Sequence, residues 1–188
     1  IVIDSYKYCA EDDRFTISVH PTKGQQCLCP VCQKKCSYYD SLDTRKWRSL
    51  DMGYTKVFLE APVHRIECPV HGVLTEYVPW ARHHSSFTRD FENTAAWMAL
   101  YLPKTAVSTY MRIAWNTIGP IISRYRKDAD PCPEHRFNGL KHIGIDETSY
   151  KKGHKYITVI VDHDTNSVIW VHERHGKEVL RGFFEQLS

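Results

Sequence analysis

Two short cysteine-rich motifs constrain this chain most strongly. The first is Cys29-Pro-Val-Cys32 and the second is Cys68-Pro-Val-His71, so each places two metal-binding side chains three positions apart. A pair at this spacing forms a tight knuckle, and two knuckles together supply the four ligands of a tetrahedral zinc ion. Three thiolates and one imidazole leave no open position for water, which predicts a structural site. Because the module is small, we expect the metal to supply part of its folding free energy.

The remaining cysteines leave the ligand set open at one point. Cys27 and Cys36 lie close enough to the first motif to replace one of its cysteines, and we treat them as bystanders. Cys9 and Cys132 are predicted to be free thiols. The chain has seven cysteines, an odd number, and it has no recognisable export signal, which argues against a disulfide framework.

The overall composition predicts a folded protein without a membrane partner. Of the 188 residues, 42% are hydrophobic and 25% are charged, so the chain can bury one large core or several small ones. No apolar run approaches the roughly 20 residues that cross a bilayer. The N-terminus has no basic segment followed by an apolar stretch, so it is not a signal peptide, and we expect a cytoplasmic protein. The net charge of +3 is too small to indicate nucleic acid by itself.

The first part of the chain has the pattern of short strands. Residues 1–26 predict an N-terminal strand segment, because apolar and polar side chains alternate there. Residues 27–87 contain the cysteine motifs and many turn residues, and they predict a zinc ribbon. Strands are expected within it at residues 55–60, 63–67 and 73–78.

The second part changes to helical spacing and then returns to strands. Residues 88–127 follow a helical period behind a possible cap at Thr88. Residues 128–141 contain two prolines and several charges, and they predict an interdomain linker. Residues 142–188 predict three strands followed by one helix.

Two helical stretches in residues 88–127 predict a helix-turn-helix. A very short connector joins Lys104–Met111 to Trp115–Tyr125. A second helix placed in this way lies in the major groove of DNA and presents its N-terminal residues to the bases. Asn116 and Thr117 stand at that end and are suited to contact bases or phosphates. Basic residues at the far end are positioned for phosphates; they are Arg124, Arg126 and Lys127.

A structural helical hairpin fits the same spacing equally well. The predicted shared core consists of Ala106, Val107, Tyr110, Trp115, Ile118, Ile122 and Tyr125. Pro120 interrupts the second helix, because proline removes a backbone hydrogen bond and clashes with the preceding turn. The helix is therefore expected either to begin late, with Thr117 as its cap, or to kink.

An acidic motif follows the linker. The segment HIGIDET at His142–Thr148 predicts a strand that delivers Asp146 and Glu147. A carboxylate on a central strand is what two-metal phosphoryl transfer requires, since three acidic groups there hold two magnesium ions. Asp162 and Asp164 fall in a predicted hairpin turn, where aspartate is common for reasons of backbone geometry, and we interpret them as turn residues.

These motifs together resemble the ISL-three family of insertion-sequence transposases. The shared parts are the CPxC…CPxH ribbon, the sequence WNTI at Trp115–Ile118 and the sequence GIDE at Gly144–Glu147, and they span nearly the whole chain. The resemblance implies an RNase H-like catalytic domain with a triad of two aspartates and one glutamate, of which Asp146 matches the first acid. It also implies structural zinc, magnesium for the complete catalytic domain, and double-stranded DNA of the element's terminal inverted repeats as the partner.

The expected fold is an α+β multidomain chain. It consists of a zinc ribbon, a helix-turn-helix, and the first three strands and first helix of an incomplete RNase H-like domain at residues 142–188. With one acid of the triad present, we expect this bacterial chain to bind its element's ends, with a homodimer as one possible state, but not to cut them. Two alternatives remain open. One is a DNA-binding regulator or transposition inhibitor, and the other is a metal nuclease that needs Asp162 or Asp164 beside Asp146.

Overall fold

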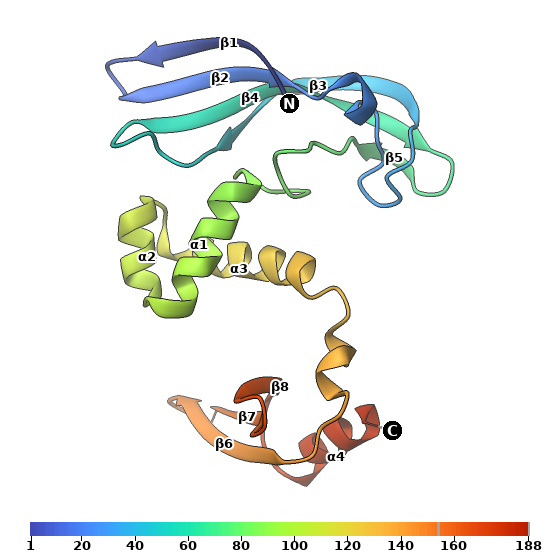
Figure 1. Ribbon diagram of the computed structural model, residues 1–188, viewed down its shortest axis with the longest axis vertical. Coiled ribbons are helices and arrows are strands. Elements are labelled where there is room, and N and C mark those ends of the chain that lie inside the picture. Colours follow the sequence, from blue (N-terminus) through green and yellow to red (C-terminus); the bar gives the residue numbers. More distant parts are fainter. Residues whose placement is uncertain (154, 188) are drawn as a thin grey trace. The chain divides into compact units, whose positions relative to one another are not determined.

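The computed structural model describes residues 1–153 and 155–187, and the chain divides into two compact units, Ile1–Ala129 and Asp130–Ser188 (Figure 1). Two residues, His154 and Ser188, lie outside the described residues. None of the helices described has both the length and the apolar character that a bilayer crossing requires.

A five-stranded sheet opens the first unit. Its strands lie in the order β1-β2-β4-β3, and β5 pairs with the far part of β4. Strands β2 and β4 run parallel over five residue pairs, while the other neighbours are antiparallel. The N-terminal strands and the cysteine-rich segment therefore share one sheet. The strand bounds are Val2–Cys9 for β1, Arg14–His20 for β2, Ser37–Arg48 for β3, Lys56–Cys68 for β4 and Gly72–Thr75 for β5.

Strand β4 continues through Pro62, where the sequence predicts a break between two strands. Proline has no N–H to donate to a ladder, so a central strand tolerates it only where the partner is irregular. The register of β3 shifts between Leu42 and Arg45, directly opposite Pro62. On the other side, β2 pairs with β4 only as far as Glu60. At Pro62, neither β2 nor β3 therefore presents a carbonyl that needs a hydrogen bond from the backbone nitrogen of the proline.

One face of the sheet carries the first core of this unit. Its buried residues come from three strands and from the segment after β5, which covers that face. Trp47 and Trp80 meet edge to face, with ring centroids 5.4 Å apart. The cluster consists of Val19, Trp47, Ala61, Val63, Trp80 and Ala81.

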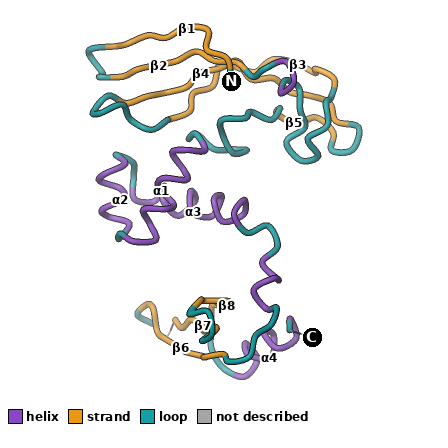
Figure 2. Tube along the Cα trace, viewed as in Figure 1, coloured by secondary structure: helices purple, strands orange, loops and turns teal. Residues whose placement is uncertain are grey.

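Three helices form the helical module of the first unit: α1 at Arg89–Tyr101, α2 at Lys104–Met111 and α3 at Trp115–Ala129 (Figure 2). Thr88 caps α1 as predicted, since its side chain accepts a hydrogen bond of 3.3 Å from the Phe91 N–H. A second apolar core joins the three helices. It consists of Phe91, Ala95, Met98, Val107, Met111, Ile118 and Ile121.

The predicted core of the helical module is wrong at two aromatic positions. Val107 and Met111 stand four residues apart on the inner face of α2, so Tyr110 points away from the core and is 73% exposed. Trp115, the first residue of α3, is 56% exposed. Met111 and Ile121 lie in the core instead of these two aromatic residues.

The second unit contains a three-stranded antiparallel sheet in the order β6-β7-β8, followed by a helix. The elements are β6 at Ile143–Lys151, β7 at Lys155–Asp162, β8 at Ser167–Glu173 and α4 at Lys177–Gln186. Helix α4 packs against the sheet through a core of Ile160, Ile169 and Phe183.

The predicted linker, residues 128–141, does not form one separate segment. Helix α3 continues to Ala129, and a 3-10 helix spans Pro133–Phe137. Phe137 and Leu140 pack against the core of the second unit, and the rings of Phe137 and Phe183 meet with centroids 5.7 Å apart. The apolar residues of this segment therefore belong to the second unit.

Candidate metal centre and nucleic-acid interface

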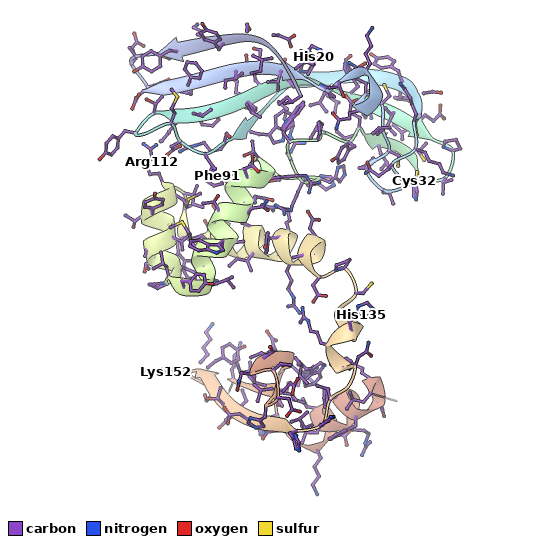
Figure 3. The ribbon with its side chains drawn as sticks, viewed as in Figure 1. His20, Cys32, Phe91, Arg112, His135 and Lys152 are labelled. Carbon is purple, nitrogen blue, oxygen red and sulfur yellow. The ribbon has the colours of Figure 1, made fainter. Side chains whose placement is uncertain are left out.

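The two cysteine motifs meet at the β5 end of the first sheet. In the first knuckle, the Cys29 N–H donates to the Lys34 carbonyl and the Gln33 N–H donates back to the Cys29 carbonyl, at 2.9 and 3.0 Å. Cys32 of the first knuckle is labelled in Figure 3. In the second, Cys68 ends β4 and His71 lies in the turn that leads into β5. Gly72 closes this turn with a φ of 71°, a left-handed conformation that glycine adopts without steric cost.

The four side chains fit a zinc ion by distance. Their ligand atoms all lie within 4.8 Å of one another. The His71 Nδ1 lies 3.6 Å from the Cys29 Sγ and 3.5 Å from the Cys68 Sγ, and the Sγ atoms of Cys32 and Cys68 are 3.8 Å apart. Zinc bonds of about 2.3 Å to sulfur and about 2.0 Å to nitrogen, arranged as a tetrahedron, require S–S edges of about 3.8 Å and S–N edges of about 3.5 Å. Cys29, Cys32, Cys68 and His71 therefore have the spacing that a tetrahedral zinc ion requires.

The neighbouring cysteines stay outside this cluster. Cys27 N–H donates to the Glu76 carboxylate at 3.0 Å, and Cys27 has a φ of 56° that turns the chain ahead of the first knuckle. The Cys36 thiol donates to the Lys34 carbonyl at 3.3 Å. Neither residue belongs to the group of ligand atoms that the structure brings together.

The pKa values of the Cys68 and Cys36 thiols are shifted in opposite directions. The Val70 backbone N–H is the main group that lowers the pKa of Cys68, to about 6, and the His71 N–H adds to it. Desolvation is the main cause that raises the pKa of Cys36 to about 11, and the nearby Cys68 adds to it. Zinc binds the thiolate form, so the lowered pKa of Cys68 favours metal binding at neutral pH.

The start of α3 is open to solvent. Asn116 is exposed and Thr117 is half-buried, while Ile118 and Ile121 on the opposite side are fully buried. The exposed stripe of the helix continues four, seven and eleven residues beyond Asn116. It contains Asn116, Pro120, Ser123 and Lys127.

Pro120 lies inside α3, because the helix begins at Trp115 rather than at a cap on Thr117. The Thr117 N–H bonds to the Ala114 carbonyl at 2.9 Å, which closes the first turn tightly. Proline has no N–H, so the Asn116 carbonyl has no donor four residues ahead of it. This carbonyl lies at the exposed start of the helix, where water or a ligand can satisfy it.

Arg124 is engaged inside the protein. Its Nε lies 2.7 Å from Oε1 of Glu92, a residue with no exposed surface. Arg82 binds the other oxygen of Glu92 at 3.0 Å, and the Ser85 hydroxyl donates to Oε1 at 2.6 Å. A buried carboxylate requires such partners, since an unpaired charge inside a protein is costly. Arg124 thus forms an internal ion pair, whereas Arg126 and Lys127 are exposed. The phosphate contacts of these three residues stay predictions.

Ion pairs connect the turn of the helix-turn-helix to the first sheet. Arg112 ends α2 in a left-handed conformation with a φ of 53°. Its Nε donates to the Asp51 carboxylate at 2.9 Å, and Arg48 at the end of β3 pairs with the same carboxylate. The Asp51 carboxylate therefore joins the strand to the turn that leads into α3.

The two acids of GIDE face opposite sides of the second sheet. Asp146 pairs with Val159 and is exposed, whereas Glu147 pairs with Thr158 on the side that carries Ile160 and α4. The Glu147 carboxylate accepts a hydrogen bond of 2.7 Å from the Gly176 N–H, just before α4. Glu147 thus binds the residue that precedes α4, whereas Asp146 lies exposed on the other face of the sheet.

Asp162 has the role of a turn residue. It accepts hydrogen bonds from the Asp164 N–H at 2.9 Å and the Thr165 hydroxyl at 2.8 Å, and these bonds, the hydroxyl first, lower its pKa. Ile160 and Asp162 alternate with Val159 along β7, so Asp162 lies on the face opposite Asp146. The nuclease alternative required these acids side by side. In the part of the chain that the structure describes, the zinc cluster is the only group of three or more potential metal ligands.

Three family models match the chain, in the order of these modules. Residues 25–71 match the zinc-finger of transposase IS204/IS1001/IS1096/IS1165, residues 76–126 match the helix-turn-helix domain of transposase family ISL3, and residues 143–188 match a model described as transposase. The chain belongs to the ISL3 transposase family.

Curated relatives of the chain are transposases of insertion sequence elements. The transposase for insertion sequence element IS1557 of Mycobacterium tuberculosis is 45% identical over 184 residues, which cover 95% of this chain and 41% of the relative. The transposase for insertion sequence element IS1001 of Bordetella parapertussis is 26% identical over 180 residues, 94% of this chain and 44% of the relative. The chain thus spans about two fifths of the length of these relatives. No solved structure matches it.

Proposed function

We propose that this ISL3-family chain recognises the terminal inverted repeats of an insertion sequence as part of a transposase. The observation that carries the proposal is the start of α3, where Asn116 is exposed while the opposite face of the helix is locked into the core. A recognition helix needs this combination, because its base contacts depend on a fixed orientation. The ion pairs of Glu92 with Arg82 and Arg124 add to that orientation.

The proposed contacts divide between bases and backbone. Asn116 is suited to an adenine, which it can bind through two hydrogen bonds, and Thr117 to a base or a phosphate. Arg126 and Lys127 are exposed near the other end of α3 and are suited to phosphates. Terminal repeats present the same site twice in opposite orientation, so we further propose that a homodimer joins the two ends.

For the second unit we propose the beginning of an RNase H-like catalytic domain. Three antiparallel strands followed by a helix agree with the start of such a domain, and Asp146 is exposed on the strand where its first acid is expected. Asp146 would hold magnesium together with carboxylates that the described residues do not supply. When bound, magnesium activates the attacking oxygen and stabilises the leaving one.

A binding experiment tests the proposed recognition. The zinc-loaded chain is titrated with a fluorescent inverted-repeat duplex and a scrambled duplex at physiological salt, with anisotropy as the readout. We expect a clear preference for the repeat, which Asn116→Ala lowers about tenfold, since one good base contact is worth about 1–3 kcal/mol. Asn138→Ala, in an exposed segment of the second unit, is the matched control and should change nothing. Equal affinity of the unmodified chain for both duplexes would refute the proposal.

The backbone contacts have their own signature. Arg126→Gln or Lys127→Gln should weaken binding to both duplexes alike and reduce the slope of log affinity against log salt by about one. Arg181→Gln removes an exposed cation from α4 and serves as the control for net charge. A slope that falls equally in the control would show that α3 makes no localised phosphate contact.

A further inference from the structure

A tryptophan and a lysine lie together where α2 and α3 begin. Trp115 is the first residue of α3, Lys104 is the first residue of α2, and the lysine Nζ lies 5.2 Å from the centroid of the indole ring. At this distance the ammonium is attracted to the face of the ring. Lys104 forms no ion pair with any acid in residues 1–153 or 155–187. Its charge is therefore held beside an exposed aromatic surface and remains available to an anion.

A second exposed tryptophan in the same module provides the contrast. Trp97 on α1 is 60% exposed, close to the value for Trp115, but its ring contacts Tyr101 at 5.2 Å. Leu100 beside it is also exposed, so this surface is apolar. Trp115 instead has a cation at its ring and Asn116 as its next residue. An anionic partner with apolar spots on its surface fits the Trp115 site, and DNA has that chemistry.

We propose that Trp115 and Lys104 form a DNA contact of their own, in which the indole packs on a thymine methyl group in the major groove and the ammonium binds the neighbouring phosphate. The inference rests on the proposed entry of α3 into that groove. Apolar side chains read thymine through its methyl group, and the N-terminus of a helix such as α2 favours a phosphate. Trp115 would then determine sequence specificity, and Lys104 would position the backbone.

Fluorine NMR of the intact zinc-loaded chain tests the contact without altering the site. The chain has five tryptophans, so labelling with 5-fluorotryptophan gives five resonances. Trp115→Phe and Trp97→Phe assign two of them by their disappearance. On titration with the inverted-repeat duplex we expect the Trp115 resonance to shift and the Trp97 resonance to stay in place.

Variants measure what the contact contributes. Trp115→Ala should lower affinity for the repeat about tenfold, whereas Trp97→Ala should leave it unchanged. Replacing thymine by deoxyuridine removes only the methyl groups, and it should weaken binding of the unmodified chain but not of Trp115→Ala. Lys104→Gln should reduce the salt slope by about one. Zinc content and circular dichroism verify that each variant is folded.

The outcomes separate this inference from the proposed function. If the unmodified chain shows no preference for the repeat, the proposed function itself fails. If it binds the repeat while the Trp115 resonance stays in place and Trp115→Ala binds equally well, only the Trp115 contact is overturned. A Trp115 resonance that moves with protein concentration in the absence of DNA would assign the surface to self-association and would also overturn the inference.

Discussion

The zinc ribbon and the helical module of the first unit are stabilised by different means. Around the metal site the buried cluster contains only Cys29, Ile66 and Cys68, with four partly buried neighbours. The helical module buries seven apolar residues from three helices. Burial of a large aliphatic or aromatic side chain contributes about 1.5–3 kcal/mol, so the helices have a core that can support them. The two knuckles at the β5 end have no comparable core, since the larger apolar core of the sheet lies around Trp47 and Trp80. The comparison indicates that metal substitutes for apolar burial where the chain is too short to form a core.

Loss of a zinc ligand should have the largest effect. Cys68→Ser removes a thiolate from the tetrahedron, and structural zinc contributes on the order of 10 kcal/mol in small zinc modules. We expect the variant to lose its zinc and the amide resonances of the two knuckles to collapse, while the helical signal in circular dichroism persists. Cys36→Ser is the matched control and should keep one zinc per chain by elemental analysis. Zinc loss in the control would place Cys36 among the ligands.

A cavity in the helical core should have the next largest effect, and it should be confined to the other region. Phe91→Ala removes a ring that is 1% exposed and should lower the free energy of unfolding by about 3–5 kcal/mol. Zinc content should be unchanged. Chemical denaturation measures the loss, with the exposed Tyr110→Ala as a control expected to cost under about 0.5 kcal/mol. A similar cost for both variants would mean that the helical core does not carry the stability of this region.

The buried ion pairs beside that core should contribute somewhat less. Glu92→Gln keeps the shape of the side chain but removes the charge shared by Arg82 and Arg124, and we expect a loss of about 2–3 kcal/mol. Arg124→Gln should cost less, because Arg82 remains on the carboxylate. Thermal unfolding at two salt concentrations checks this. Salt should change the difference little, since buried pairs are weakly screened.

The last prediction concerns pH and returns to the metal site. The pKa of Cys68 in the folded chain, about 6, lies below the ordinary value of about 8.5. The stabilisation that its thiolate provides is therefore present in full above the ordinary value and is lost as the pH falls through about 6. Protons also compete with the metal, so zinc should be retained at pH 7 and released in acid.

Elemental analysis of the intact chain after dialysis at pH values from about 4 to 8 tests this prediction. The Cys36→Ser variant should lose its zinc over the same pH range as the unmodified chain. Zinc retained in full at about pH 4 would contradict the prediction.

Local spacing explains what the sequence alone could predict. The zinc ligands lie three residues apart within each knuckle, and the helices repeat every three to four residues, so both patterns are visible in short stretches. The predicted bounds of Lys104–Met111 agree with α2, and Thr88 caps α1. The order of three strands and a helix in the second unit was also predictable.

Distant partners explain what the sequence could not reveal. Strand β3 buries only Trp47 and Arg48 near its end, so its sequence has no alternation of apolar and polar residues that predicts a strand. Its backbone hydrogen bonds depend on pairing with β4, which follows later in the chain. The sequence predicts a DNA contact for Arg124 and not its ion pair with Glu92, because Glu92 lies 32 residues earlier and local spacing does not reveal such a partner. Trp115 was assigned to the core by residue type, although the side of a helix that faces inward depends on the neighbouring helices.

The carboxylate of Asp51, shared by Arg48 and Arg112, has a consequence for how a double helix would be read. If the strands and α3 turn as one body, any contact made from the sheet has a fixed angular position around the DNA axis relative to the groove that α3 occupies. Inserting about five base pairs, half a turn, between two such contacts would carry one of them to the far side of the duplex. Asp51 would in this way fix the spacing, in base pairs, between the two contacted parts of the DNA without touching a base.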